Sequence, residues 1–360
     1  MNFTKRALSS INVGKRVTVI GANGGIGQPL SLLLKLDKSI SHINLYDVVG
    51  APGVAADLSH INTPTSVRGF GLNAEQYGLL NQYTSNENTI EKETLLSFQD
   101  KEFDRSLKGS DIVVIPAGVP RKPGMTRQDL FHVNASLMTD FAIKISRNCP
   151  EALVAIISNP VNSLVPIFAE TMKQHNCYNP SKIFGVTTLD MLRANTFISE
   201  VTGVESSEIN IPVIGGHAGE SILPLFSQSK PYIRHMLNED QVIEITKRIQ
   251  NAGTEVVLSK AGAGSATLSM AKAGAKFINS LVRALNGDDN VIECAYVESD
   301  IIPECKWFST PLKLGINGIE KNYGLGQLDE FEKKQLKLAI KELEPSIKEG
   351  IEFTHFKLLV

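Results

Sequence analysis

The chain has 360 residues, of which 42% are hydrophobic, and a formal net charge of -2 at pH 7. This length allows two lobes with buried cores, and the charge balance gives no electrostatic reason to expect a nucleic acid partner. No apolar run approaches the roughly 20 residues of a membrane span. The four cysteines, Cys149, Cys177, Cys294 and Cys305, lie far apart without metal-ligand spacing, so we expect buried thiols in a reducing compartment and no metal.

The first 14 residues are basic and contain no acidic side chain. They include Lys5, Arg6 and two consecutive serines, and the first acidic residue of the chain is Asp37. This composition is typical of a mitochondrial presequence, and Arg6 to Ser10 resembles a matrix-processing site. We expect residues 1–14 to direct the protein to the mitochondrial matrix. The alternative is a short disordered tail on a cytoplasmic protein.

A glycine-rich loop follows the first apolar run, Val17 to Ile20, and precedes a second one, Leu30 to Leu36. This order predicts strand, turn and helix, in which Gly24 lets the backbone approach a pyrophosphate at the helix N-terminus. The loop residues that we expect to bind a dinucleotide are Gly21, Ala22, Asn23, Gly24, Gly25, Ile26 and Gly27. Their G-x-x-G-x-x-G spacing departs from the commoner G-x-G-x-x-G, and such loops also occur in unrelated turns.

The next predicted strand, Ile43 to Tyr46, ends at Asp47, 20 residues after Gly27. A carboxylate at this distance accepts hydrogen bonds from an adenosine ribose. It would repel a 2'-phosphate, so the cofactor indicated is NAD rather than NADP. The alternative is a solvated aspartate at a strand end.

Residues 73–104 form a polar insertion, rich in Asn, Gln, Glu, Ser and Thr. Such a segment has little to bury, and a surface excursion of this length costs little loop-closure entropy. We expect a short helix from Thr89 to Phe98 and no chemistry.

The strand Asp111 to Ile115 leads into a loop rich in proline and glycine that carries Arg121 and Arg127. Two arginines in a loop above the carboxyl edge of a sheet suit a lid over an anionic substrate. A basic surface loop is the alternative. A helix from Asp129 to Cys149, carrying Asn134, and a strand from Leu153 to Ile157 follow.

Asp190 and Arg193 are three residues apart on a predicted helix and therefore share a face. His217 lies in the glycine-rich segment Gly215 to Gly219. A carboxylate behind a histidine fixes its tautomer and stabilises the imidazolium, and a guanidinium matches a substrate carboxylate. The alternatives are a surface ion pair and a histidine in a loop or core.

The predicted fold is α/β. A Rossmann-type doubly wound parallel sheet, residues 15–160, is expected to bind NAD, and a mixed α/β substrate domain with antiparallel strands, residues 161–360, follows it. Helices are expected over 239–258, 265–285 and 329–353, the last bent or interrupted at Pro345.

These motifs together resemble the NAD-dependent malate dehydrogenases of the mitochondrial and bacterial type, within the lactate/malate dehydrogenase group. The resemblance runs from about Arg16 to the C-terminal helix. It rests on the glycine loop and on Asp57 to His60, Pro120 to Arg127, Asn159 to Asn162, Asp190 to Arg193, Gly215 to Gly219 and Gly264 to Met270.

The resemblance implies that His217 is the acid/base, Asp190 its partner and Arg193 the clamp on the shared carboxylate. It also implies that Arg127 polarises the reacting oxygen and that Arg121 binds the second carboxylate of a dicarboxylate. The residues expected along the nicotinamide half of the cofactor are Asn134, Ile157, Ser158, Asn159 and Met270, with Asn159 also at the substrate.

The implied reaction is the oxidation of (S)-malate to oxaloacetate by NAD. The resemblance implies a homodimer or a tetramer, of which we expect the homodimer. Two alternatives stay open. A dehydrogenase for another 2-hydroxy acid would keep the His/Asp/Arg set without needing Arg121. A sensor of the same fold would bind NADH without turnover.

Overall fold

The computed structural model describes residues 14–82, 90–119 and 127–356. The predicted presequence therefore lies almost wholly outside the described residues, as does Arg121. Arg127 is the first residue of a helix, but its side chain is not described.

Six parallel strands form the first part of the sheet, in the order β3-β2-β1-β4-β5-β6. Their bounds are β1 (Lys15–Ile20), β2 (Ile40–Val49), β3 (Ser66–Leu72), β4 (Ile112–Ile115), β5 (Leu153–Ile156) and β6 (Ile183–Gly185). This is the strand order of a doubly wound sheet, which confirms the predicted fold class. The parallel part extends to Gly185, and the expected domain division at residue 160 stays a prediction.

Five further strands continue the same sheet with antiparallel pairing. They are β7 (Val213–Gly215), β8 (Ile222–Pro224), β9 (Val291–Glu298), β10 (Trp307–Gly315) and β11 (Gly318–Asn322). The two parts join where Gly185 of β6 pairs with Tyr296 of β9. A side chain at position 185 would collide with Val161, Val165 and Tyr296, so a glycine lets α6 and β9 close over the joint.

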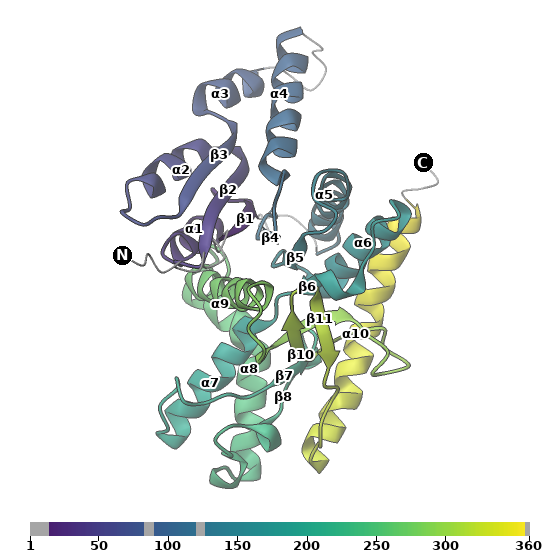
Figure 1. The fold of residues 1–360 in the computed structure, drawn as a ribbon. Coiled ribbons are helices and arrows are strands. Elements are labelled where there is room, and N and C mark those ends of the chain that lie inside the picture. The colour runs from purple at the N-terminus through teal and green to yellow at the C-terminus, as the bar shows by residue number, and fades with distance from the viewer. Residues whose placement is uncertain (1–13, 83–89, 120–126, 357–360) are drawn as a thin grey trace, which may run out of the picture.

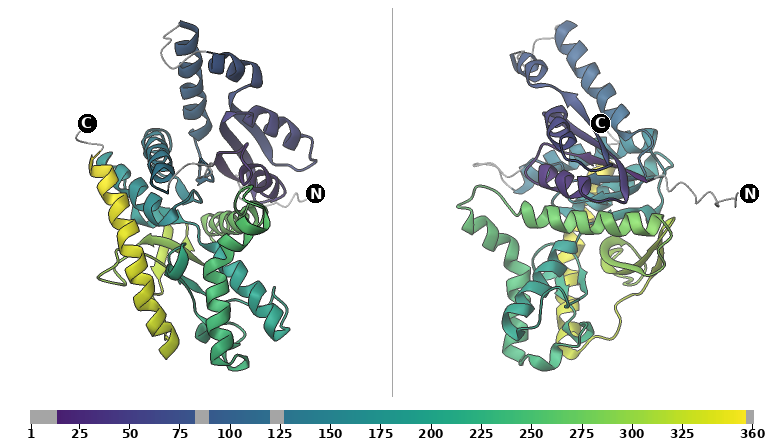
Figure 2. Two further views of the ribbon diagram at one scale, coloured as in Figure 1. Left: turned by 180° about the vertical axis from the view of Figure 1, so that it is seen from behind. Right: turned by 60° about the vertical axis from the view of Figure 1, so that its left-hand side comes forward.

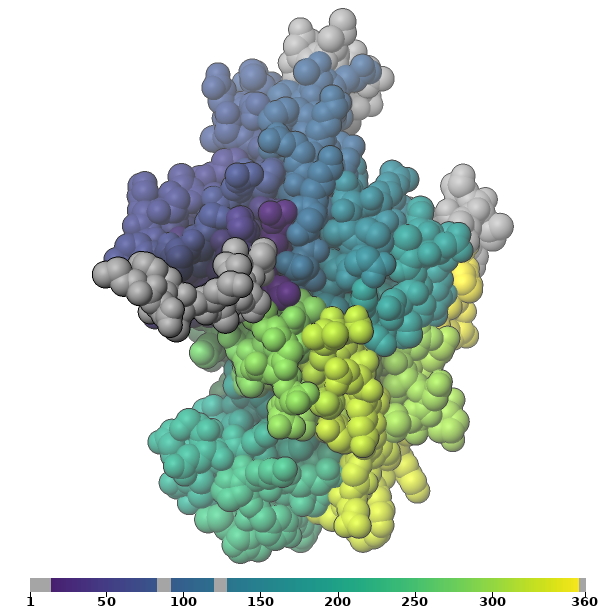
Figure 3. Space-filling view, in the orientation of Figure 1, coloured from purple at the N-terminus to yellow at the C-terminus, as the bar shows by residue number. Residues whose placement is uncertain are grey.

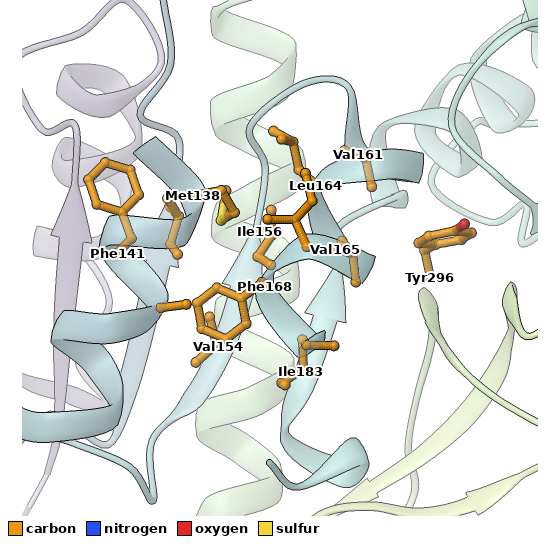
Figure 4. Close-up of a cluster of buried hydrophobic side chains, with 14 of the residues drawn as sticks. Met138, Phe141, Val154, Ile156, Val161, Leu164, Val165, Phe168, Ile183 and Tyr296 are labelled. Atoms are coloured by element: carbon orange, nitrogen blue, oxygen red, sulfur yellow. The ribbon is translucent and has the colours of Figure 1, made fainter. Parts of the chain in front are cut away.

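Helices cover both faces of the parallel strands (Figure 1). Their bounds are α1 (Gly27–Lys35), α2 (Ala51–Ser59), α3 (Ala74–Gln82), α4 (Ile90–Leu107), α5 (Arg127–Asn148), α6 (Val161–Gln174), α7 (Thr188–Thr202), α8 (Glu239–Ser259), α9 (Leu268–Leu285) and α10 (Glu330–Phe356). The residues of β4 point alternately into two hydrophobic cores, one on each face of the sheet. In the first core Ile112 and Val114 pack with α1, α2 and α9, and in the second core Val113 and Ile115 pack with α4, α5 and α6. Figure 4 shows part of the second core, to which Phe168, Val154 and Ile183 belong.

The N-terminal and C-terminal parts of the chain meet at α9. In Figure 3 the purple and blue N-terminal residues form the upper part of the visible face, and green and yellow residues lie below them. The views in Figures 1 and 2 agree that α9 runs beneath α1, on which it packs. The N-terminal end of this helix lies beside the glycine loop, since a Cβ on Gly25 would lie 3.1 Å from Cγ2 of Thr267, the N-cap residue of α9.

The described residues of the polar insertion form α3 and the greater part of α4, and the end of α4 is more buried than the composition predicts. Its second helix, α4, continues to Leu107 instead of ending at Phe98. Phe103 stacks on Tyr46 of β2 with ring centroids 4.1 Å apart and meets Phe141 of α5 edge-on at 5.7 Å. The expectation that the segment buries little is therefore wrong for the end of α4, although its other end and α3 project from the sheet (Figures 1 and 2).

Two other helix predictions need correction. Pro345 does not interrupt α10, which runs from Glu330 to Phe356 as one helix. The helix predicted from residue 265 begins at Leu268. Within the described part of the chain, no helix is both long and apolar enough to cross a bilayer.

Candidate active site

The glycine loop connects β1 to α1 through a turn that only glycine permits at two positions. Gly21 has φ +91°, and a Cβ on it would lie 2.6 Å from Cα of Ala117. A Cβ on Gly27 would lie 2.0 Å from the carbonyl oxygen of Gly21. The N–H groups of Gly21 and Ala22 donate to the carbonyl of Tyr46, at 2.8 and 3.0 Å. The loop is therefore held against the end of β2.

The N-terminus of α1 suits an anion. Its first turn contains no acidic residue, and its N-cap, Ile26, makes no side-chain cap hydrogen bond. The position of a Cβ on Gly24 has one neighbour near it, the carbonyl oxygen of Gly21 at 3.3 Å. Backbone N–H groups at the positive end of the helix dipole thus fit the pyrophosphate of a dinucleotide.

Asp47 lies beside this loop and also shapes it. Its Oδ2 accepts the N–H of Asn23 at 2.8 Å, and its Oδ1 accepts the N–H of Val48 at 2.8 Å. Burial raises the pKa of this carboxyl above its ordinary value, against the lowering effect of the two backbone hydrogen bonds. The predicted strand end at Asp47 is wrong, because β2 continues to Val49.

The structure brings His217 next to Asp190 and Arg193 of α7. Nδ1 of His217 lies 2.6 Å from Oδ2 of Asp190, whose side chain is fully buried. Because a carboxylate only accepts, Nδ1 is the donor, and in the neutral ring Nε2 is left as the acceptor. The second carboxylate oxygen lies 3.5 Å from Nη1 of Arg193, so the aspartate orients both side chains.

A pocket of about 390 Å³ joins these residues to the cofactor side. Its walls come from the glycine loop, the segment after β5, α7, the histidine loop (Gly215 to Gly219), β8, α8 and α9. The lining includes Ile26, Asn159, Asp190, Arg193, His217, Gln250, Thr254 and Met270. Ile26 and Met270 are 244 positions apart in the chain, so the pocket exists only once both halves have folded.

Other predicted residues lie beside the pocket rather than in its wall. Asn134 accepts the N–H of Val119 at 2.9 Å and donates to the carbonyl of Asn159 at 2.9 Å. It therefore ties the segment that precedes the predicted lid to a residue of the pocket wall. Ile157 and Ser158 are buried, and the hydroxyl of Ser158 donates to the carbonyl of Ile115 at 2.9 Å.

The sequence did not single out three residues that contribute to the site. Gln250 and Thr254 of α8 line the pocket, and no local motif marks them within an amphipathic helix. Asn162 accepts a backbone N–H from His217 at 2.9 Å. Its position in the segment Ser158 to Asn162 was the available signal.

Among the described residues, no group of three His, Cys, Asp or Glu side chains is arranged to hold a metal ion.

Comparisons with known proteins agree with this geometry. Residues 15–83 and 84–185 match the family model for the lactate/malate dehydrogenase NAD binding domain, and residues 187–354 match that for the alpha/beta C-terminal domain of the same family. The chain is similar to the mitochondrial malate dehydrogenases of Felis catus (54% identity) and Homo sapiens (52%), each over 94% of this chain and 91% of the relative.

Solved structures support the fold. The apo malate dehydrogenase of Picrophilus torridus superposes with a TM-score of 0.76, at 24% identity, over 95% of this chain and 99% of that chain. Two family models that together cover most of the chain, and relatives above 50% identity, confirm the resemblance noted in the sequence. The chain therefore belongs to the lactate/malate dehydrogenase family.

Proposed function

We propose that the chain is an NAD-dependent malate dehydrogenase that interconverts (S)-malate and oxaloacetate. The observation that carries this proposal is the pocket in which the paired His217 and Asp190, together with Arg193, face Ile26 and Met270 from the cofactor side. The curated relatives, named mitochondrial malate dehydrogenases, support the choice of substrate.

His217 is proposed as the acid/base. With Nδ1 donating to Asp190, Nε2 is free to take the hydroxyl proton of malate and to return it in the reverse direction. The buried carboxylate of Asp190 stabilises the imidazolium that results. Bound NAD would supply the acceptor for the hydride of C2 of malate, and the protein supplies orientation and charge.

Three arginines are proposed to hold the dicarboxylate. Arg193 lines the pocket and presents paired donors that match one carboxylate. Arg127 and Arg121 are assigned from the family resemblance, to the reacting oxygen and to the second carboxylate. Asn159, in the pocket wall, is proposed to contact both substrate and cofactor.

The cofactor site is proposed to follow the geometry of the loop. The loop from Gly21 to Gly27 would hold the pyrophosphate, and Asp47 would accept hydrogen bonds from the adenosine ribose hydroxyls. Met270, Asn134, Ile157 and Ser158 would hold the nicotinamide end of the cofactor. The glycine turn, the uncapped helix N-terminus and the adjacent carboxylate fit NAD.

The decisive experiment is a spectrophotometric assay of NADH loss with oxaloacetate, pyruvate and 2-oxoglutarate in turn. We expect fast turnover with oxaloacetate and slow or no turnover with the other two. Preference for another 2-oxo acid would favour a different dehydrogenase of the family. NADH binding without turnover on any of the three would favour a sensor.

Arg121→Gln tests the basis of specificity. An arginine left unpaired over the methyl group of pyruvate is a buried uncompensated charge, whereas it pairs with the second carboxylate of oxaloacetate. We expect the ratio of kcat/KM for oxaloacetate to that for pyruvate to fall by about a thousandfold. Lys122→Gln removes one positive charge from the same loop and should leave the ratio unchanged. Equal losses on both substrates would reject the assigned role.

Assembly, location and domain division complete the proposal. We propose a homodimer through α1 and α7, because Leu32 and Val201 are 39% and 44% exposed on these helices, and light scattering of the purified protein tests it. Residues 1–14 are proposed as a presequence for the mitochondrial matrix, tested by import of a fusion with and without them. Residues 15–160 and 161–360 are proposed as the NAD-binding and substrate domains.

A further inference from the structure

Asn162 lies at the start of α6 and connects three parts of the fold. Its side chain is 3% exposed, and its Oδ1 accepts the backbone N–H of His217 at 2.9 Å. Its own carbonyl oxygen accepts the hydroxyl of the buried Tyr296, on β9, at 3.2 Å. The residue is thus fixed to the central sheet on one side and to the histidine loop on the other.

Ser221 holds the next residue of the histidine loop. Its Oγ accepts the N–H of Ala218 at 3.1 Å and lies 3.5 Å from Nδ2 of Asn162. Two consecutive backbone N–H groups, those of His217 and Ala218, are therefore held by two neighbouring side chains. The turn leaves no room to spare: a Cβ on Gly216 would lie 2.9 Å from Oδ1 of Asn162 and 2.6 Å from Oγ of Ser221.

This arrangement sets where the imidazole lies. His217 follows a three-residue strand, β7, and precedes a three-residue 3-10 helix, η2 (Gly219–Ser221), so regular structure holds its backbone only weakly. The 2.6 Å contact with Asp190 requires the ring in one place, and a catalytic group displaced by 1 Å loses about 100-fold in rate. Asn162 is not among the residues that line the pocket, so any effect it has on the reaction passes through another residue.

We propose that Asn162 is a positioning residue for His217, which sets the place of the acid/base through the backbone N–H of His217. This inference rests on the proposed function, since it assigns His217 to proton transfer. A residue that only stabilised the fold would lower the melting temperature without a selective effect on kcat.

Asn162→Ala is the first test. We expect kcat to fall by about 100-fold, with the dissociation constant of NADH unchanged. Asn162→Asp keeps an oxygen that accepts the N–H of His217 and should recover most of the lost kcat. If the alanine variant does not fold, Asn162→Ser replaces it, because the shorter hydroxyl does not reach this N–H.

Asn195→Ala is the matched control. Asn195 is also buried, and its Oδ1 accepts the backbone N–H of Ile211 at 3.1 Å, away from the pocket wall. Its substitution should lower the melting temperature and leave kcat unchanged. Loss of kcat in Asn195→Ala equal to that in Asn162→Ala, or a folded Asn162→Asp as slow as Asn162→Ala, would overturn the proposal.

A double substitution tests whether Asn162 acts through the histidine. In a His217→Asn background, Asn162→Ala should cause no further loss of kcat. A further loss of about 100-fold, as in the wild-type background, would overturn the proposal.

A measurement without turnover separates this inference from the proposed function. In protein labelled with 15N-histidine, the neutral ring of His217 should carry its proton on Nδ1, because that atom donates to Asp190. Asn162→Ala should mix the two tautomers, whereas Asn195→Ala should not. If wild type lacks malate dehydrogenase activity, the proposed function fails, but the tautomer measurement still decides whether Asn162 positions His217. An unchanged tautomer in Asn162→Ala would overturn the proposal that Asn162 is a positioning residue.

Discussion

The two glycine-rich loops of the site have similar backbones and opposite uses. Each leaves a strand through a glycine with positive φ, +91° at Gly21 and +98° at Gly215. The first opens the nine-residue helix α1, whose N-cap makes no side-chain hydrogen bond, although the N–H groups of Gly21, Ala22 and Asn23 earlier in the loop are bound to β2. The second loop precedes the three-residue η2, and the side chains of Asn162 and Ser221 accept the backbone N–H groups of His217 and Ala218 in this loop.

The two loops differ in what their functions require of the backbone. A loop that binds a ligand with its backbone needs space, and glycines provide it at Gly24 and Gly27. A loop that presents a reactive side chain needs its backbone held, and buried side chains from other segments do so for His217. Substitutions in the two loops should therefore fail in different ways.

The largest effect is expected in the histidine loop. His217→Asn keeps a polar side chain of smaller size but removes the acid/base, so kcat should fall by about 10⁴-fold. The dissociation constant of NADH, measured by fluorescence, should not change, because the glycine loop is untouched. Weakened NADH binding in this variant would contradict the separation of the two loops.

An intermediate effect is expected in the glycine loop. In Gly27→Ala the added Cβ meets the backbone oxygen of Gly21 at 2.0 Å, so the turn must shift. We expect loss of NADH binding and a free energy of unfolding lower by about 3 kcal/mol, measured by urea denaturation. Gly53→Ala, in α2, is the control, since nothing lies within 4 Å of its Cβ. Helix propensity should make that variant more stable by up to about 1 kcal/mol. Equal behaviour of the two variants would contradict the steric role of Gly27.

The smallest effect is expected at Asp47. Asp47→Asn should weaken NADH binding by about tenfold, the value of one charge-assisted hydrogen bond, and reduce the preference over NADPH. Burial raises the pKa of Asp47, so in the wild type NADH affinity should fall as the pH is lowered toward that raised value and the carboxylate is protonated. The variant should lack this dependence. Parallel pH curves for the two proteins would show that Asp47 is not the titrating group.

Short-range patterns explain what the sequence predicted well. The glycine turn, the buried strands and the spacing of Asp190 and Arg193 are each readable within a few residues, because local geometry decides them. The pairing of Asp190 with His217, 27 positions away, followed from chemistry, since a buried carboxylate and a histidine of one site have few other partners.

Tertiary packing explains what the sequence did not predict. Phe103 appeared within a polar segment, but it finds Tyr46 and Phe141, and this contact extends α4 to Leu107. Pro345 costs α10 a backbone hydrogen bond, yet the helix continues because Leu343 and Ile347 on either side are buried and hold it in place. Such contacts depend on segments that are distant in the chain.

The final helix carries a consequence for biosynthesis. Leu343 of α10 is fully buried, and a Cβ on Gly216 would lie 2.5 Å from its Cδ2, so this leucine backs the turn that bears His217. A ribosome makes α10 more than a hundred residues after that turn. A nascent chain can therefore complete its dinucleotide cradle once α9 has been made, while the catalytic imidazole gains its full support only when α10 follows.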